Sequence, residues 1–127
     1  MILGLGIDVA SIERMERALA RHGERMWERI LTTEERRELE GRSADRAAAL
    51  AGRFAAKEAL SKALGAPRDV WFHDVEVRRG ALGAPEIRLL GPAVKRAQER
   101  GVARCFVSIT HDAGVAAAVV VLEGDAG

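Results

Sequence analysis

The sequence predicts an α+β fold, with an antiparallel-rich sheet packed with a long central helix and shorter helices. Three observations support this class. Strand-type alternation occurs near the N-terminus, β-type apolar runs occur near the C-terminus, and an alanine-rich stretch without proline lies between them. Strands at both ends with helices between them are typical of the α+β class. At 127 residues, the chain is expected to form a single domain spanning residues 1–127.

The first expected element is a strand from Ile2 to Val9, where apolar residues alternate with small or polar ones. Gly4, Gly6 and Asp8 share one face of this strand, because side chains alternate between faces. The strand therefore carries a carboxylate at its end, on a face almost free of side chains. The alternative is that Asp8 caps the next helix, although Ser11 is better placed to do so.

The helix that follows carries a basic ridge, formed by Arg14, Arg17 and Arg21 at spacings of three and four residues. A solvated face is the common interpretation of such a ridge. The alternative is docking of an acidic partner, because guanidinium groups pair bidentately with carboxylates.

The long central helix includes the stretch from Arg53 to Leu64 and ends at Gly65, with Pro67 beyond it. At 100° per residue, the helix has an apolar side of Ala56, Ala59, Leu60 and Ala63, and a polar side of Lys57, Glu58, Ser61 and Lys62. Phe54 projects from the middle of the polar side, which suggests that substrate or another subunit covers it. The alternative is a solvated face on which Glu58 and Lys62 form an i,i+4 ion pair.

The remaining elements follow Pro67 and are read from β-rich runs, glycine turns and a helix-starting proline. They are a hairpin of Val70–Val77 and Pro85–Leu89, a helix from Pro92 to Gly101, and a closing hairpin of Cys105–His111 and Val115–Leu122. His73, on a strand, is expected to be a structural hydrogen-bonding residue. His111 lies at a strand end beside a tight turn, where a side chain can reach a cleft, so a site role and a structural role both remain open.

Charge and cysteine content narrow the function classes. The chain has 20 basic and 19 acidic residues, so its net charge of +1 provides no overall field for binding nucleic acid or membrane. The single cysteine, Cys105, excludes an internal disulfide framework, and its apolar surroundings predict a buried thiol. The N-terminal apolar stretch lacks a basic region before it and is too short to span a membrane, so a cytoplasmic location is expected.

Two carboxylates and a lysine on separate elements supply the parts of a magnesium site bridged to phosphate: Asp8 on the strand, and Glu58 with Lys62 on the helix. Mg²⁺ usually takes one or two protein carboxylates, keeps waters and binds phosphate oxygens directly. A lysine can then neutralise phosphate charge. The sequence contains neither a Walker loop, nor a G-x-G-x-x-G motif, nor a zinc-ligand pattern.

Together these residues resemble a known family. The segments that carry the resemblance are Gly6–Asp8 with Arg14, Arg29–Thr32, Arg53–Ala59 continuing into Ser61–Ala63, Gly83–Pro85, and Ser108–His111. They look like the holo-[acyl-carrier-protein] synthases of the 4′-phosphopantetheinyl transferase superfamily, in its short branch with a single repeat. Thr110 stands where many relatives have serine. The segment from Glu38 to Ala48 matches no motif of the family, and its role is open.

The resemblance implies transfer of 4′-phosphopantetheine from coenzyme A to a serine of apo-acyl carrier protein, with release of adenosine 3′,5′-bisphosphate. It implies that Asp8 and Glu58 bind Mg²⁺ and that Lys62 faces the pyrophosphate of the coenzyme. It also implies that Arg53 lies near the coenzyme's phosphates and that the loop from Gly83 to Pro85 lies near its adenine. Whether the carrier serves fatty-acid or polyketide synthesis is left open.

The resemblance further implies that Arg14 and Arg21 grip the acidic helix of the carrier protein. Members of this branch form homotrimers with active sites between subunits, which would account for Phe54 on the polar side of its helix. A competing hypothesis is a non-catalytic nucleotide-binding or protein-interaction module that uses the arginine ridge alone. That hypothesis does not explain the placement of the two carboxylates and Lys62.

The catalytic role that the sequence does not assign is the acceptor of the serine proton. Glu58, Glu35 acting through a water, and His111 are the candidates, and His111 is also a candidate for binding the coenzyme. Glu35 is additionally expected to form a capping box with Thr32 at the start of a short helix.

Overall fold

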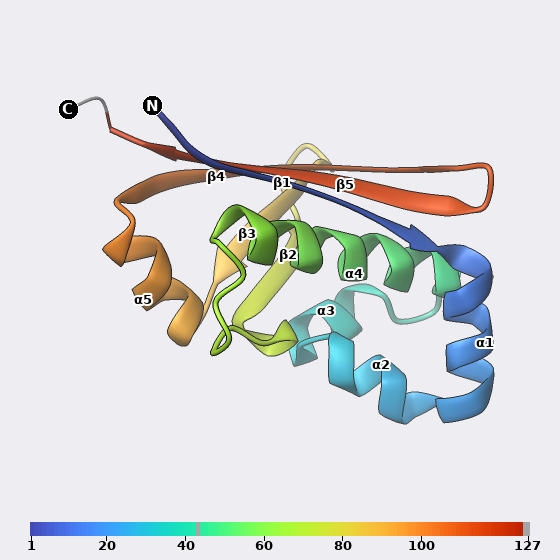
Figure 1. Cartoon of the computed structure of the whole chain (residues 1–127). Helices are drawn as coiled ribbons and strands as arrows, with labels where there is room; N and C mark the ends of the chain where they lie inside the picture. The colour runs from blue at the N-terminus through green and yellow to red at the C-terminus, as the bar shows by residue number, and fades with distance from the viewer. Residues whose placement is uncertain (43, 126–127) are drawn as a thin grey trace.

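The computed structural model describes residues 1–42 and 44–125, and it confirms the α+β class (Figure 1). The elements of this part of the chain are β1 (Ile2–Ser11), α1 (Ile12–His22), α2 (Glu24–Ile30), α3 (Thr33–Glu38), α4 (Arg46–Ala63), the 3₁₀ turn η1 (Phe72–Asp74), β2 (Val75–Arg79), β3 (Pro85–Leu89), α5 (Pro92–Glu99), β4 (Val102–Asp112) and β5 (Val115–Gly124). Ser43 and the last two residues lie outside the described part. None of the described helices is long and apolar enough to cross a membrane.

A sheet with the strand order β1-β5-β4 forms the upper layer in Figure 1, and the long helix α4 runs beneath it. Both neighbours of β5 pair with it in antiparallel orientation. The shorter helices α1, α2 and α3 lie on the other side of α4 from the sheet. The β2–β3 hairpin forms a separate antiparallel pair, as predicted.

The packing of β1 on α4 depends on two glycines. A Cβ atom at Gly6 would lie 1.8 Å from the carbonyl oxygen of Ala59, and one at Gly4 would lie 2.2 Å from that of Ala63. The strand backbone therefore lies directly against the helix backbone, which small residues on both elements permit. This close contact places the end of β1, with Asp8, next to the middle of α4.

The branched apolar residues of β1 point away from α4. Leu5, Ile7 and Val9 are between 59% and 65% exposed, and Phe106 on β4 is 53% exposed. The sheet thus buries one face against α4, where β1 contributes only small residues, and leaves large apolar side chains exposed on the other face. Contiguous exposed apolar surface of this kind marks an interaction site.

The structure corrects one expected strand. The run from Val70 to Val77 becomes a strand only at Val75, because a turn closes before it. The Asp74 carboxylate accepts a hydrogen bond from the Trp71 backbone N–H at 2.8 Å, and the Asp74 N–H donates to the Trp71 carbonyl at 3.0 Å. This local side-chain to backbone pairing outcompetes the high strand propensity of the run. His73 is structural, as expected, and its Nε2 lies 2.6 Å from the carbonyl oxygen of Glu28.

Candidate active site on two flanks of the sheet

The structure brings Asp8, Glu58 and Lys62 together at the β1 edge, as the sequence predicts. Lys62 Nζ donates hydrogen bonds to Asp8 Oδ1 and to the Ile7 carbonyl, both at 3.0 Å. Partial burial and then the negative charge of Asp8 raise the pKa of Glu58, and Lys62 opposes this shift. The ion pair that Lys62 forms in the described structure is with Asp8, so the alternative Glu58–Lys62 pair is wrong.

These groups fit a hard divalent cation. Two carboxylates interact at one edge of the sheet. The pKa of Glu58 is raised because Lys62 does not fully offset the cost of burying its negative charge beside Asp8. Within residues 1–42 and 44–125, no group of three or more His, Cys, Asp and Glu side chains is placed to hold a metal. Two carboxylates are nevertheless the usual protein contribution to a Mg²⁺ site that phosphate and water complete.

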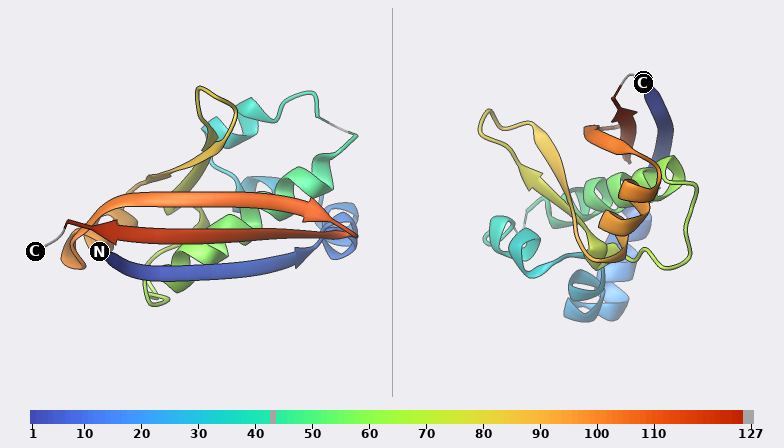
Figure 2. Two further views of the ribbon diagram at one scale, coloured as in Figure 1. Left: turned by 90° about the horizontal axis from the view of Figure 1, so that it is seen from above. Right: turned by 90° about the vertical axis from the view of Figure 1, so that its left-hand side faces the viewer.

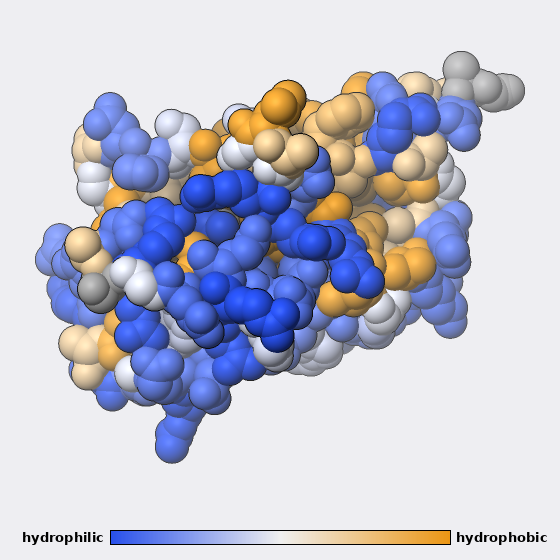
Figure 3. All heavy atoms as spheres, turned by 180° about the vertical axis from the view of Figure 1, so that it is seen from behind, coloured by the Kyte–Doolittle hydropathy of each residue, from blue (hydrophilic) through white to orange (hydrophobic). Residues whose placement is uncertain are grey.

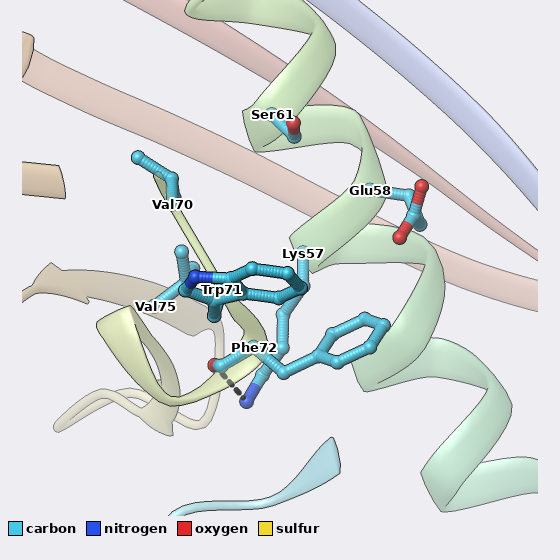
Figure 4. Close-up of a pocket in the computed structure, with 7 residues that line it drawn as sticks. All are labelled: Lys57, Glu58, Ser61, Val70, Trp71, Phe72 and Val75. Carbon is cyan, nitrogen blue, oxygen red and sulfur yellow. Dashed lines mark hydrogen bonds between the residues drawn. The ribbon is translucent and has the colours of Figure 1, made fainter. Parts of the chain in front are cut away.

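A cavity of about 200 Å³ opens beside Glu58, between α4 and the segment that leads into β2. Figure 4 shows Glu58 and Ser61 projecting from the helix and Trp71 and Phe72 projecting from the facing segment. The residues that line the cavity are Lys57, Glu58, Ser61, Val70, Trp71, Phe72 and Val75. We call Asp8, Glu58, Lys62 and this cavity the β1 flank.

The helical pattern predicts the environment of Lys57 wrongly. It is expected on the polar side of α4 but is buried, and its Nζ donates to Glu35 Oε1 at 2.6 Å, to the Ile30 carbonyl at 2.6 Å and to the Phe72 carbonyl at 2.9 Å. Burial lowers the pKa of Lys57, and the charge of Glu35 opposes that shift. The pattern misses this residue because a lysine with a buried carboxylate partner is indistinguishable in sequence from a solvated one.

Glu35 is a structural residue, which removes it as a proton acceptor. Its side chain has no exposed surface. One carboxylate oxygen accepts from Lys57 and from the Thr32 backbone N–H, and the other accepts from the Val77 N–H at 2.8 Å. The predicted capping box with Thr32 is present. Glu58 and His111 remain as the candidate bases.

A second group of predicted site residues lies on the hairpin side of α4. The residues that line a cavity of about 140 Å³ there are Arg53, Arg78, Arg79, Gly83, Pro85 and Ile109. Burial lowers the pKa of Arg53, and among the described residues its buried Nε has no hydrogen-bond partner. Three guanidinium groups around one hollow suit a phosphate-bearing ligand. Arg78 and Arg79 were missed, although two consecutive arginines at a strand end are a visible signal.

His111 lies on this same side of the molecule. We call His111 and the cavity beside Arg53 the β4 flank. It is exposed near the end of β4, and the sheet register aligns it through Ala116 with Ala10 of β1. Its charge contributes to lowering the pKa of Asp45 at the start of α4, where the main cause is the hydrogen bond from Arg42. The hydrophilic surface of this side is visible in Figure 3, below the apolar edge of the sheet.

The two flanks lie on opposite sides of the molecule. In Figure 2 the β2–β3 hairpin lies on one side of α4, whereas the segment from residue 64 to residue 71 lies on the other, beside β1. Strand β5 separates β1 from β4. A single chain therefore does not bring His111, Arg53 and the Gly83–Pro85 loop to Asp8, Glu58 and Lys62.

The arginine ridge of α1 is exposed, and Arg17 forms a loose pair with Glu13 at 3.7 Å. A groove of about 290 Å³ beside it is lined by Val9, Ala10, Ser11, Arg14, Met15, Ala18, Met26 and Phe54. Phe54 is half-buried and packs on Phe72, with ring centroids 5.6 Å apart. Contacts within the chain therefore bury part of the Phe54 side chain, whose position on the polar side of the helix the sequence did not explain.

Comparison with known proteins identifies relatives over nearly the whole chain. The family model of the 4′-phosphopantetheinyl transferase superfamily matches residues 4–120. A holo-[acyl-carrier-protein] synthase of Anaeromyxobacter sp. (strain K) is 49% identical over 127 residues, which covers 98% of each chain. The enzyme of that class from Streptomyces coelicolor is 48% identical over 123 residues, covering 97% of this chain and 98% of that protein.

Solved structures with a similar fold are also holo-[acyl-carrier-protein] synthases. The holo-[acyl-carrier-protein] synthase of Neisseria meningitidis superposes with a TM-score of 0.87 at 36% identity, covering 97% of this chain and 99% of that one. The Helicobacter pylori enzyme, solved in complex with coenzyme A, superposes with a TM-score of 0.81 at 34% identity, covering 94% and 99%.

Proposed function

The chain belongs to the 4′-phosphopantetheinyl transferase superfamily, and we propose that its active site combines the β1 flank of one copy with the β4 flank of another. The reaction is transfer of the 4′-phosphopantetheine group of coenzyme A to a serine of apo-acyl carrier protein, giving holo-acyl carrier protein and adenosine 3′,5′-bisphosphate. The enzyme acts as one transferase domain. The observation that supports its location is the meeting of Asp8, Glu58 and Lys62 at one sheet edge.

On the β1 flank, Asp8 and Glu58 are the residues that would hold Mg²⁺, which stabilises charge on the pyrophosphate when bound. Lys62 is about half exposed and rests on Asp8, so its ammonium group can turn to a phosphate oxygen of the coenzyme. Of the two remaining candidate bases, Glu58 is the one that lies on the β1 flank beside this position, which favours it over His111 as the acceptor of the serine proton.

The β4 flank would bind the nucleotide part of coenzyme A. Arg53, Gly83 and Pro85 border the arginine-lined cavity, whose charge suits the phosphates of the coenzyme, and His111 lies along the same edge of the sheet. One coenzyme molecule needs both flanks, but they face opposite directions in one chain. Two copies of the chain that meet flank to flank supply a complete site.

The assembly that follows is a ring. The β1 and β4 flanks are different surfaces, so their contact is heterologous, and heterologous contacts whose rotation closes produce cyclic oligomers. The open sheet face, with Leu5, Ile7, Val9 and Phe106, supplies apolar surface for such a contact. We propose the homotrimer that the resemblance implies.

The carrier protein would dock on α1. Arg14 and Arg21 present positive charge to an acidic helix, and the neighbouring groove, which includes Met15, Met26 and Phe54, offers apolar contact. This groove also includes Val9 and Ala10, which follow Asp8 on β1, so a serine delivered here arrives next to the metal position. We place the reaction in the cytoplasm, since the free thiol of Cys105 suits a reducing compartment.

The proposed reaction is tested by incubating the purified chain with coenzyme A, Mg²⁺ and an apo-acyl carrier protein. We expect intact-mass spectrometry to show the mass increase of one phosphopantetheine arm on the carrier, and none on a carrier whose acceptor serine is replaced by alanine. Removal of Mg²⁺ with a chelator should abolish the increase. Binding of coenzyme A without any change in carrier mass would instead support the non-catalytic module.

A further inference from the structure

The chain has two tryptophans in very different environments. Trp27 is 7% exposed in the core, whereas Trp71 is 70% exposed beside the cavity of the β1 flank. An exposed indole is a large apolar group with a polar N–H, a combination that is enriched where proteins bind ligands. The established reaction and the site described above assign no role to Trp71.

The backbone that carries Trp71 is fixed at several points. The reciprocal hydrogen bonds with Asp74 hold the turn at 2.8 Å and 3.0 Å. The next residue, Phe72, accepts a hydrogen bond from Lys57 on α4 and packs on Phe54. The exposure of the indole is therefore a consequence of an anchored turn that holds it at the mouth of the cavity.

The cavity itself is mostly apolar and begins at the predicted metal position. Glu58 forms one end, Ser61 adds a hydroxyl, and valine and phenylalanine side chains complete the walls (Figure 4). Lys57 contributes its methylene stem, because its ammonium group is bonded to Glu35 on the far side. This lining disfavours a phosphate-bearing ligand and favours a chain of methyl, methylene and amide groups.

We propose that this cavity receives the pantetheine arm of coenzyme A and that Trp71 contacts the arm as a specificity-determining residue. The inference rests on the proposed function, which places the pyrophosphate between Asp8, Glu58 and Lys62. The nucleotide is assigned to the arginine-lined β4 flank and the carrier to α1, so the cavity is the remaining path from Glu58. The Ser61 hydroxyl and the indole N–H can bond the amides of the arm, and the indole face packs on its methyl groups.

The kinetic test compares Trp71→Ala with Trp71→Phe, which keeps an aromatic wall. For Trp71→Ala we expect the KM for coenzyme A to rise roughly two- to tenfold, the range that corresponds to loss of one aromatic contact. Inhibition by adenosine 3′,5′-bisphosphate, which lacks the arm, should be unchanged, as should the KM for the carrier. Trp71→Phe should stay within about twofold of wild type.

Three results would overturn the inference: an unchanged KM for coenzyme A, an equal loss of bisphosphate inhibition, or an effect confined to the carrier. A spectroscopic readout is independent of turnover. Coenzyme A should change the tryptophan emission of the wild-type chain, the bisphosphate should change it much less, and Trp71→Phe should abolish the difference. If the wild-type chain transfers no phosphopantetheine, the proposed function fails, whereas active enzyme with insensitive Trp71 variants refutes only this subsite.

Discussion

At the scale of single residues, the proposed chemistry depends on two carboxylates that repel each other and on a lysine that pairs with one of them. Lys62 rests on Asp8 at 3.0 Å, and the pKa of Glu58 is raised by burial and by Asp8. Such an arrangement costs stability in the free chain and becomes favourable once a cation binds. The sequence predicted these three residues but not the pairing, because the helical spacing alone favours Glu58 with Lys62.

Replacing either carboxylate is expected to remove magnesium-dependent transfer. Asp8→Ala and Glu58→Ala should each lower kcat/KM by roughly a hundredfold or more, since a bound metal contributes several kcal/mol to charge stabilisation. Glu99→Gln on α5 is a matched control outside both flanks and should retain wild-type activity. Circular dichroism should show an intact fold in all three, and full activity in either Ala variant would refute the metal assignment.

The raised pKa of Glu58 has a defined sign in stability measurements. The folded chain binds this proton more tightly than the unfolded chain, so the contribution to stability is lost as the pH rises through the folded-state pKa. Glu58→Gln should therefore flatten the pH dependence of Tm above the ordinary glutamate pKa and leave Tm at pH 7 equal to or above that of wild type.

Mg²⁺ provides the control for this prediction. It should raise the Tm of the wild-type chain at pH 7 by mass action and leave that of Glu58→Gln nearly unchanged. Parallel Tm profiles for the two chains, with equal responses to Mg²⁺, would contradict the electrostatic role given to Glu58.

At the scale of elements, α4 is positioned by one buried ion pair and by two glycines of the strand above it. The alternation of β1, the long helix and both hairpins were predictable because they follow from local periodicity and turn residues. The burial of Lys57 was not, because its partner Glu35 is 22 residues away in sequence. The late start of β2 at Val75 was missed because the Asp74 side chain closes a turn by a hydrogen bond to the backbone, and strand propensity takes no account of such a bond.

The buried pair predicts a large loss of stability for Lys57→Met. This substitution leaves Glu35 buried without its ammonium partner, and breaking such a pair typically costs about 3–5 kcal/mol. Arg17→Met, which breaks the exposed pair with Glu13, should change the free energy of unfolding by less than about 0.5 kcal/mol. Urea unfolding measures both, and a similar small change in both variants would show that the buried network is not needed.

The contact between β1 and α4 predicts that Gly6→Ala is harmful to both fold and site. Its Cβ would lie 1.8 Å from the Ala59 carbonyl oxygen, so the strand must move away from the helix, at a cost of about 1–3 kcal/mol or more. Because Asp8 moves with the strand, transfer activity should fall even where the variant is folded. Gly23→Ala, which meets open space but has positive φ, should lose stability and keep its activity.

At the scale of the whole molecule, the strand order β1-β5-β4 separates residues that we propose for a single active site. Local patterns singled out Asp8 and Glu58, and the family resemblance added Arg53, but neither predicted their placement on opposite flanks, because strand order is a long-range property of the fold. The sheet also has an exposed apolar face that includes Leu5, Ile7 and Val9. Copies of the chain can bury this face when they bring a β1 flank and a β4 flank together.

The most direct test of a shared active site is complementation between two inactive variants, Asp8→Ala on the β1 flank and Arg53→Ala on the β4 flank. When the two are unfolded and refolded together in equal amounts, random mixing should restore about a quarter of the wild-type transfer activity, because a quarter of the contacts join two intact flanks. Each variant refolded alone should stay inactive. If the mixture is as inactive as its components while forming mixed oligomers, each site lies within one chain and the shared-site account is wrong.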